Sequence, residues 1–159
     1  MVTVSSGQES KVVILQTLLN GLLTSVKNIV PNILELERPR LLGESIRISQ
    51  GVIVGTIGDC KGNILISGEK EVFNRIAQTM YGMQLEGEML SSFIAELSNM
   101  IAGSFSTIVE VNGISIDITS PTLLEGDVVI SGYHKAILMK CHLIQDDHFD
   151  IVFSMEETN

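Results

Sequence analysis

Apolar residues recur at helical spacing in three stretches of the chain. The first run, over residues 6–30, opens on Ser6-Gly7-Gln8-Glu9, which matches a helix capping box. The second covers residues 69–81 and is followed by Gly82, a typical C-terminal stop. The third and longest covers residues 88–109. The pattern therefore predicts three helices.

Most of the remaining chain alternates apolar and polar residues, as half-buried strands do. Short turns rich in Gly, Asn and Asp separate these segments, which favours antiparallel pairing. Within the longest early strand, Gly51 and Gly55 mark possible bulges. The predicted strands cover residues 33–37, 45–57, 63–67, 114–119, 128–130, 133–144 and 149–153. Helices packed on a largely antiparallel sheet give an α+β fold.

Length and charge narrow the class of protein. The 159 residues, 45% of them hydrophobic, predict one globular domain over residues 1–159. A formal net charge of −9 disfavours binding to nucleic acid or to an anionic membrane. Polar residues interrupt the apolar stretch 12–30, and the N-terminus does not match a signal peptide, so we expect a cytoplasmic protein without a membrane span.

The cysteines and the acidic C-terminal turn offer no clear metal site. Cys60 and Cys141 lie far apart, without zinc-type spacing, and are interpreted as reduced thiols. Asp146, Asp147, His148 and Asp150 do not match the spacing of a calcium loop. They are explained more simply as a polar turn between two strands.

The third predicted helix has one low, polar side. Ser92, Glu96, Asn99 and Gly103 fall within roughly 60° of one another on a helical wheel, and we call them the polar ridge. The opposite side carries the expected core residues Leu90, Phe93, Ile94, Leu97, Met100, Ile101 and Phe105. Since a glycine inside a helix costs about 1 kcal/mol relative to alanine, its presence suggests close approach by another macromolecule. On spacing alone, an ordinary solvated helix face with a tolerated glycine is the favoured explanation.

Two alanines are expected to keep the polar ridge low. Ala95 and Ala102 are predicted to flank it, so that Glu96 and Asn99 are its only projecting groups.

A second Glu-x-x-Asn pattern, Glu71 to Asn74, lacks the following glycine and a downstream proline. That pair is predicted to be a solvated helix face.

The surroundings of the ridge resemble a known family. Residues 96–103 are followed by an alternating strand and then by Ser120-Pro121-Thr122. The CheC/CheX family, phosphatases of the phosphorylated chemotaxis response regulator CheY, is marked by an Asp or Ser, then Glu-x-x-Asn, then a proline about two dozen residues later. Ser92, Glu96, Asn99 and Pro121 occupy those positions. The resemblance covers most of the chain, looks closest to CheX, and implies a CheC-like fold.

The resemblance also implies a mechanism. The substrate is the aspartyl phosphate of a CheY-like response regulator; Asn99 orients the attacking water and Glu96 pairs with a lysine of the regulator. Ser92, Gly103 and Pro121 contact the partner or shape the nearby loop. The enzyme needs no cofactor of its own, because the Mg²⁺ belongs to the regulator. CheX-type proteins are homodimers whose sheets join edge to edge, so a homodimer is expected.

Two non-enzymatic alternatives remain open. The same fold serves as a binding module in flagellar-switch components such as the FliM middle domain. A scaffold that binds a receiver domain without hydrolysis would also keep the ridge. The presence of both Glu96 and Asn99 favours the phosphatase.

Overall fold

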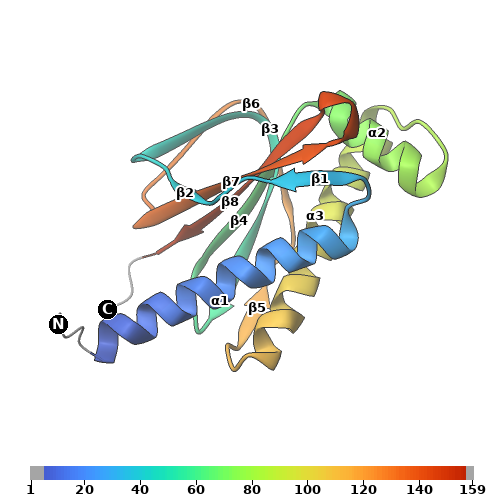
Figure 1. The fold of residues 1–159 in the computed structure, drawn as a ribbon. Helices are drawn as coiled ribbons and strands as arrows, with labels where there is room; N and C mark the ends of the chain where they lie inside the picture. The colour runs from blue at the N-terminus through green and yellow to red at the C-terminus, as the bar shows by residue number, and fades with distance from the viewer. Residues whose placement is uncertain (1–5, 157–159) are drawn as a thin grey trace.

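The computed structural model describes residues 6–156 and, within them, the side chains from residue 11 onward. This part of the chain forms a sheet with helices packed on it (Figure 1). The helices are α1 (Ser6–Ile29), α2 (Lys70–Tyr81) and α3 (Gly87–Val111). The strands are β1 (Ile33–Leu36), β2 (Arg40–Leu41), β3 (Ser45–Gly58), β4 (Gly62–Ser67), β5 (Ile116–Ile118), β6 (Thr122–Ser131), β7 (Lys135–Leu143) and β8 (His148–Met155).

All the strand pairs of this sheet are antiparallel. The order is β1-β7-β8-β4-β3-β5, with β2 beside β7 and β6 beside β3. The predicted α+β class and the three predicted helices are therefore confirmed. The predicted end of α2 is confirmed as well, because Gly82 adopts the left-handed conformation with φ 73° and its N–H donates to the carbonyl of Gln78. The proposed cap of α1 involves side chains outside the described ones.

Helix α1 packs against α3 along part of its length and crosses it (Figure 1). Residues Lys11–Ile29 are long and apolar enough to span a membrane by length and composition alone, with a mean hydropathy of 1.3. However, Leu18, Leu22 and Val26, spaced four residues apart, are almost completely buried in the main core. That buried stripe is typical of an amphipathic helix packed on its own protein.

Two small residues of α1 fix how it meets α3. A Cβ atom at Gly21 would lie 2.7 Å from Cγ1 of Val109, so only glycine allows this close crossing. One turn later, the buried hydroxyl of Ser25 donates to the backbone carbonyl of Ile101 at 2.6 Å. Together these contacts hold α3 in one rotational setting against α1.

The sheet changes its buried face part-way along β3. Ile46 and Ile48 pack in a small apolar cluster on the face opposite the helices, whereas Val52 and Val54 pack in the main core beneath the helices. The register with β6 also shifts in this region, between residues 48 and 50, where the single residue Ser49 of β3 lies opposite Gly126 and Asp127 of β6. The extra residue of this bulge therefore belongs to β6, and Gly126 adopts a positive φ of 99° there.

The predicted bulges at Gly51 and Gly55 are wrong. A Cβ atom at Gly51 would lie 2.7 Å from the carbonyl oxygen of Ile66, and one at Gly55 would lie 2.9 Å from Oγ1 of Thr119. Both glycines therefore permit close approach of neighbouring chain within a regular part of the ladder.

Strand β6 is much longer than predicted. The sequence pattern marks only residues 128–130, whereas the strand covers Thr122–Ser131 and pairs along most of its length with β3. Most of its side chains are exposed, so the alternation that marks a half-buried strand is weak. The two-residue strand β2 was not predicted for the same reason.

Candidate functional site

The polar ridge lies on the side of α3 that its neighbours leave partly uncovered. The sheet, α1 and α2 all contact α3, and the ridge lies between the parts of the helix that they cover. Ser92 and Glu96 are exposed there, and Asn99 and Gly103 are half-buried. The structure therefore places the four predicted residues on one open face of a single helix.

The predicted boundary of the buried face of α3 is wrong in two places. Ala102 is completely buried, and so it does not flank the open ridge. Met100, which was expected to lie in the core, is only half-buried. The reason is the position of α1, which covers the side of α3 that carries Ser98, Ala102 and Val109. Ala95 is half-buried, as expected for a residue beside the ridge.

The C-terminal end of the ridge lies next to β5. A Cβ atom built on Gly103 would lie 4.0 Å from Cδ1 of Ile118 and would meet nothing nearer. Thr119, the next residue after Ile118, is held on β3: its N–H donates to the carbonyl of Gly55 at 2.9 Å, and its Oγ1 accepts from the Gly55 N–H at 2.8 Å. This anchor sets the path of the chain toward Pro121, which is half-buried at the start of β6.

Sequence reasoning did not single out Thr119. Its clamp on Gly55 becomes visible only once β3 and β5 are paired, because 64 residues separate the two partners.

Glu96 and Asn99 have free side chains in the part of the chain that the structure describes. Among the side chains of residues 11–156, no cation lies within ion-pair distance of the Glu96 carboxylate, and no group bonds the Asn99 amide. Neighbouring Ser98 differs, since its hydroxyl is buried and donates to the Ile94 carbonyl at 2.8 Å. One helical turn apart, an unpaired acid and an unpaired amide are available to a partner.

A shallow hollow lies beside the ridge, at the start of α3. Its lining combines apolar side chains with the exposed polar side chains of the helix: Tyr81, Leu85, Glu88, Met89, Ser92, Phe93 and Glu96. Sequence reasoning missed this hollow because Tyr81 and Leu85 come from outside α3.

The second Glu-x-x-Asn pattern has a structural role. The side-chain oxygen of Asn74 accepts a hydrogen bond from the N–H of Leu85 at 2.9 Å, and so it secures the connection between α2 and α3. Its amide oxygen is thereby engaged within the protein, unlike that of Asn99.

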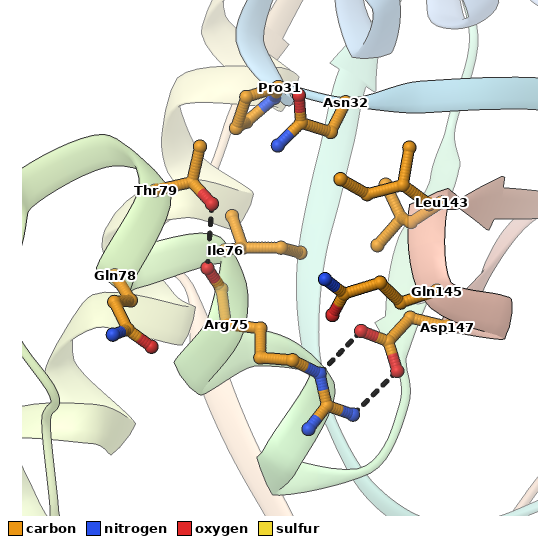
Figure 2. A pocket seen from close by; sticks show the side chains of 10 residues that line it. Pro31, Asn32, Arg75, Ile76, Gln78, Thr79, Leu143, Gln145 and Asp147 are labelled. Atoms are coloured by element: carbon orange, nitrogen blue, oxygen red, sulfur yellow. Dashed lines mark hydrogen bonds and ion pairs between the residues drawn. The ribbon is translucent and has the colours of Figure 1, made fainter.

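A more enclosed cavity lies between α2, the α1–β1 turn and the β7–β8 turn (Figure 2). On one side, Arg75 forms a paired hydrogen bond with Asp147 through Nε and a terminal nitrogen. This contact raises the pKa of the arginine above its ordinary value. The cavity volume of about 240 Å³ is below the range usual for small-molecule sites, roughly 300–1,000 Å³. It contains none of the ridge residues.

The polar β7–β8 turn is thus tied to α2 by an ion pair, which accounts for Asp147 as a structural residue. Asp146 and the preceding Gln145 adopt left-handed backbone conformations, with φ 61° and 65°, as tight turns require. Within the described residues, no group of three metal-binding side chains comes together.

Both cysteines are buried and free. Burial raises the pKa of the Cys60 thiol, and burial together with the nearby Asp150 raises that of Cys141 to about 12. Because the thiolate is the reactive form, neither side chain is suited to act as a nucleophile at neutral pH.

Comparison with known proteins identifies the family. The family model for "Chemotaxis phosphatase CheX" matches residues 50–139, which is more than half of the chain and includes the ridge. The chain belongs to the CheX family. The CheY-P phosphatase CheX of Thermotoga maritima is 27% identical over 149 residues, which cover 87% of this chain and 96% of that protein.

Solved structures confirm the CheX/CheC-like fold. A CheX protein from Borrelia burgdorferi, solved in a complex with CheY, BeF₃ and Mg²⁺, is 24% identical and has a TM-score of 0.73; the match covers 91% of this chain and 98% of that one. A CheC-like protein from Shewanella sp. PV-4 is 22% identical with the same TM-score, covering 91% and 97%.

Proposed function

We propose that this protein, acting as one CheX-like domain, accelerates loss of the aspartyl phosphate from a CheY-like response regulator. The observation that carries the proposal is the pair of unpaired polar side chains, Glu96 and Asn99, one turn apart on an open helix face of a CheX-family chain. The Thermotoga relative is a CheY-P phosphatase, and the Borrelia relative was solved bound to CheY.

The chemistry requires little from the enzyme. In phosphoryl transfer the transition state is loose, so placing the water in line with the phosphorus matters more than removing its proton. The oxygen of the water bonds to phosphorus while the bond to the aspartyl oxygen breaks, giving inorganic phosphate and a free carboxylate. The regulator's own site supplies its Mg²⁺.

Asn99 suits the positioning role because a carboxamide has no usable pKa and can both accept from and donate to one water molecule. Its half-buried position limits the directions in which the amide points. We propose that it enters the regulator's phosphorylation site and holds the water there.

Glu96 serves as the docking residue. It is exposed and has no ion-pair partner within the described residues, so its carboxylate is free to bind a lysine of the regulator. The neighbouring Ser92 contributes a polar contact, and Gly103 leaves room for the partner's backbone. Pro121 shapes the loop beyond β5. The expected compartment is the cytoplasm, where a response regulator is found.

The direct test is phosphate release from a panel of purified phosphorylated receiver domains. We expect the protein to shorten the lifetime of at least one phosphorylated receiver by a factor of 10 or more at micromolar concentration. A protein that binds such receivers without changing the lifetime of any of them would instead be a scaffold or a switch module.

We further propose that the protein is a homodimer joined through its sheet edges. The outer edge of the ten-residue strand β6 has no strand partner within residues 6–156, and such an edge offers unpaired N–H and C=O groups to a second chain. Light scattering is expected to give twice the mass of the 17.3 kDa chain. A monomeric mass at concentrations well above those of the turnover assay would contradict this proposal.

A further inference from the structure

Two large apolar side chains that line the shallow hollow at the start of α3 are exposed to solvent. Tyr81, the last residue of α2, is 56% exposed, and Met89, in the first turn of α3, is 63% exposed. The Tyr81 ring stands edge-on against Phe93, with ring centroids 5.8 Å apart. Leu85 and Phe93 close the bottom of the hollow, since both are buried. The exposed apolar groups thus rest on a buried apolar floor.

The hollow is already formed in the free protein. Gly82 ends α2 in a left-handed conformation, and the side-chain oxygen of Asn74 accepts a hydrogen bond from the N–H of Leu85. The T-shaped contact with Phe93 limits the motion of Tyr81. A partner that fills such a hollow loses little free energy in ordering the α2–α3 connection.

The hollow is continuous with the polar ridge. Ser92 and Glu96 belong to both, and Met89 precedes Asn99 by ten residues, or about 15 Å along the helix. A standard protein interface buries about 800 Å² on each partner, which corresponds to a radius of about 16 Å. A receiver domain centred on Asn99 therefore reaches about as far along the helix as Met89.

We propose that this hollow receives an apolar side chain of the docked phosphorylated receiver, and that Met89 and Tyr81 set the affinity for it. The inference rests on the proposed function, and it assigns a second contact beyond the Glu96 carboxylate. Tyr and Met are enriched at the centres of protein interfaces, and a thioether side chain adapts well to the shape of a partner.

The charges around the hollow favour a receiver over a second copy of this chain. Its rim carries the carboxylates of Glu88 and Glu96. A symmetric contact between two such faces would bring these acids against one another, and like charges across an interface are strongly unfavourable. A receiver that offers a lysine to Glu96 meets no such repulsion.

The test replaces Met89 with serine in the full chain. Serine is well tolerated in the first turn of a helix, so the fold is expected to remain intact, as checked by thermal melting. The dissociation constant is measured with the beryllofluoride-activated receiver that gives the fastest turnover in the panel. We expect Met89→Ser to raise both this constant and KM about tenfold, which is the effect of losing about one well-buried methionine contact, with kcat changed less than twofold.

Tyr81→Ser is the second variant, and Val12→Ser is the matched control. Val12 belongs to the N-terminal part of α1 and is 55% exposed, so its replacement also removes exposed apolar surface. Figure 1 shows the N-terminal end of α1 far from α2. We expect Tyr81→Ser to weaken binding as Met89→Ser does, and Val12→Ser to bind like the wild type.

The outcomes separate the two proposals. If the wild type binds and turns over the receiver but both hollow variants bind equally well, the role of the hollow is refuted and the proposed function stands. The role of the hollow is also refuted if the two variants lower kcat and leave the dissociation constant unchanged. It is refuted as well if Met89→Ser changes the oligomeric mass, because the hollow would then be filled by a second copy of this chain. If the wild type binds no activated receiver, both proposals fail.

Discussion

Replacing Asn99 with alanine is expected to reduce the acceleration of phosphate loss by about 100-fold or more, because the attacking water is then no longer held in line. Alanine is a better helix former than asparagine, and no protein group depends on the Asn99 amide within the described residues. The melting temperature should therefore be unchanged or slightly higher. The measurement is the rate at which the phosphorylated receiver decays, at enzyme concentrations high enough to give the maximal rate with the wild type.

Asn20→Ala provides the matched control. Asn20 is exposed on α1, away from the ridge, so the same change of residue tests for general effects of losing a surface amide. Its turnover should equal that of the wild type. If the folded Asn99→Ala variant dephosphorylates the receiver at the wild-type rate, then the proposed role of the amide is wrong.

Replacing Glu96 with lysine is expected to affect docking more than chemistry. The substitution replaces the exposed carboxylate with a cation on a longer side chain, which repels the lysine that Glu96 is proposed to bind. We expect KM to rise between about 10- and 100-fold, with kcat at saturating receiver within a few-fold of the wild type. High salt should reduce the difference in KM between the wild type and Glu96→Lys, because salt screens exposed charges.

Glu44→Lys separates local pairing from overall charge. Glu44 is exposed between β2 and β3, and either substitution makes the formal net charge of −9 less negative by two. If reduced net charge alone weakened the attraction to the receiver, both variants would show the same rise in KM. We expect Glu44→Lys to change KM less than threefold.

The helices were predictable from the sequence, whereas the outer strand was not. Each helix carries a long apolar stripe, and Gly82 marks the end of α2 through local geometry alone. Strand β6 lies at a sheet edge with most side chains in water, so its sequence lacks the alternation that pairing would otherwise impose. The bulge at Gly126 and Asp127 of β6 was likewise not predicted, because it is defined by the register between β6 and β3.

The polar ridge was predictable from helical periodicity, but its surroundings were not. A helical wheel places Glu96 and Asn99 together, and it cannot show that α1 covers one flank and buries Ala102. The clamp between Thr119 and Gly55 and the hollow beneath Tyr81 both join segments that are distant in sequence. Neither feature has a local pattern, so tertiary structure was needed to find them.

Gly103 reveals a conflict between folding and recognition in this helix. A methyl group at this position would meet only Ile118, at an ordinary contact distance of 4.0 Å, so alanine is sterically allowed. Alanine would also make the isolated protein more stable by about 0.5–1 kcal/mol, since it restricts the unfolded chain. A search for heat-resistant variants that scores only melting temperature would therefore favour Gly103→Ala, and under the proposed function that change would narrow the partner's access to Asn99.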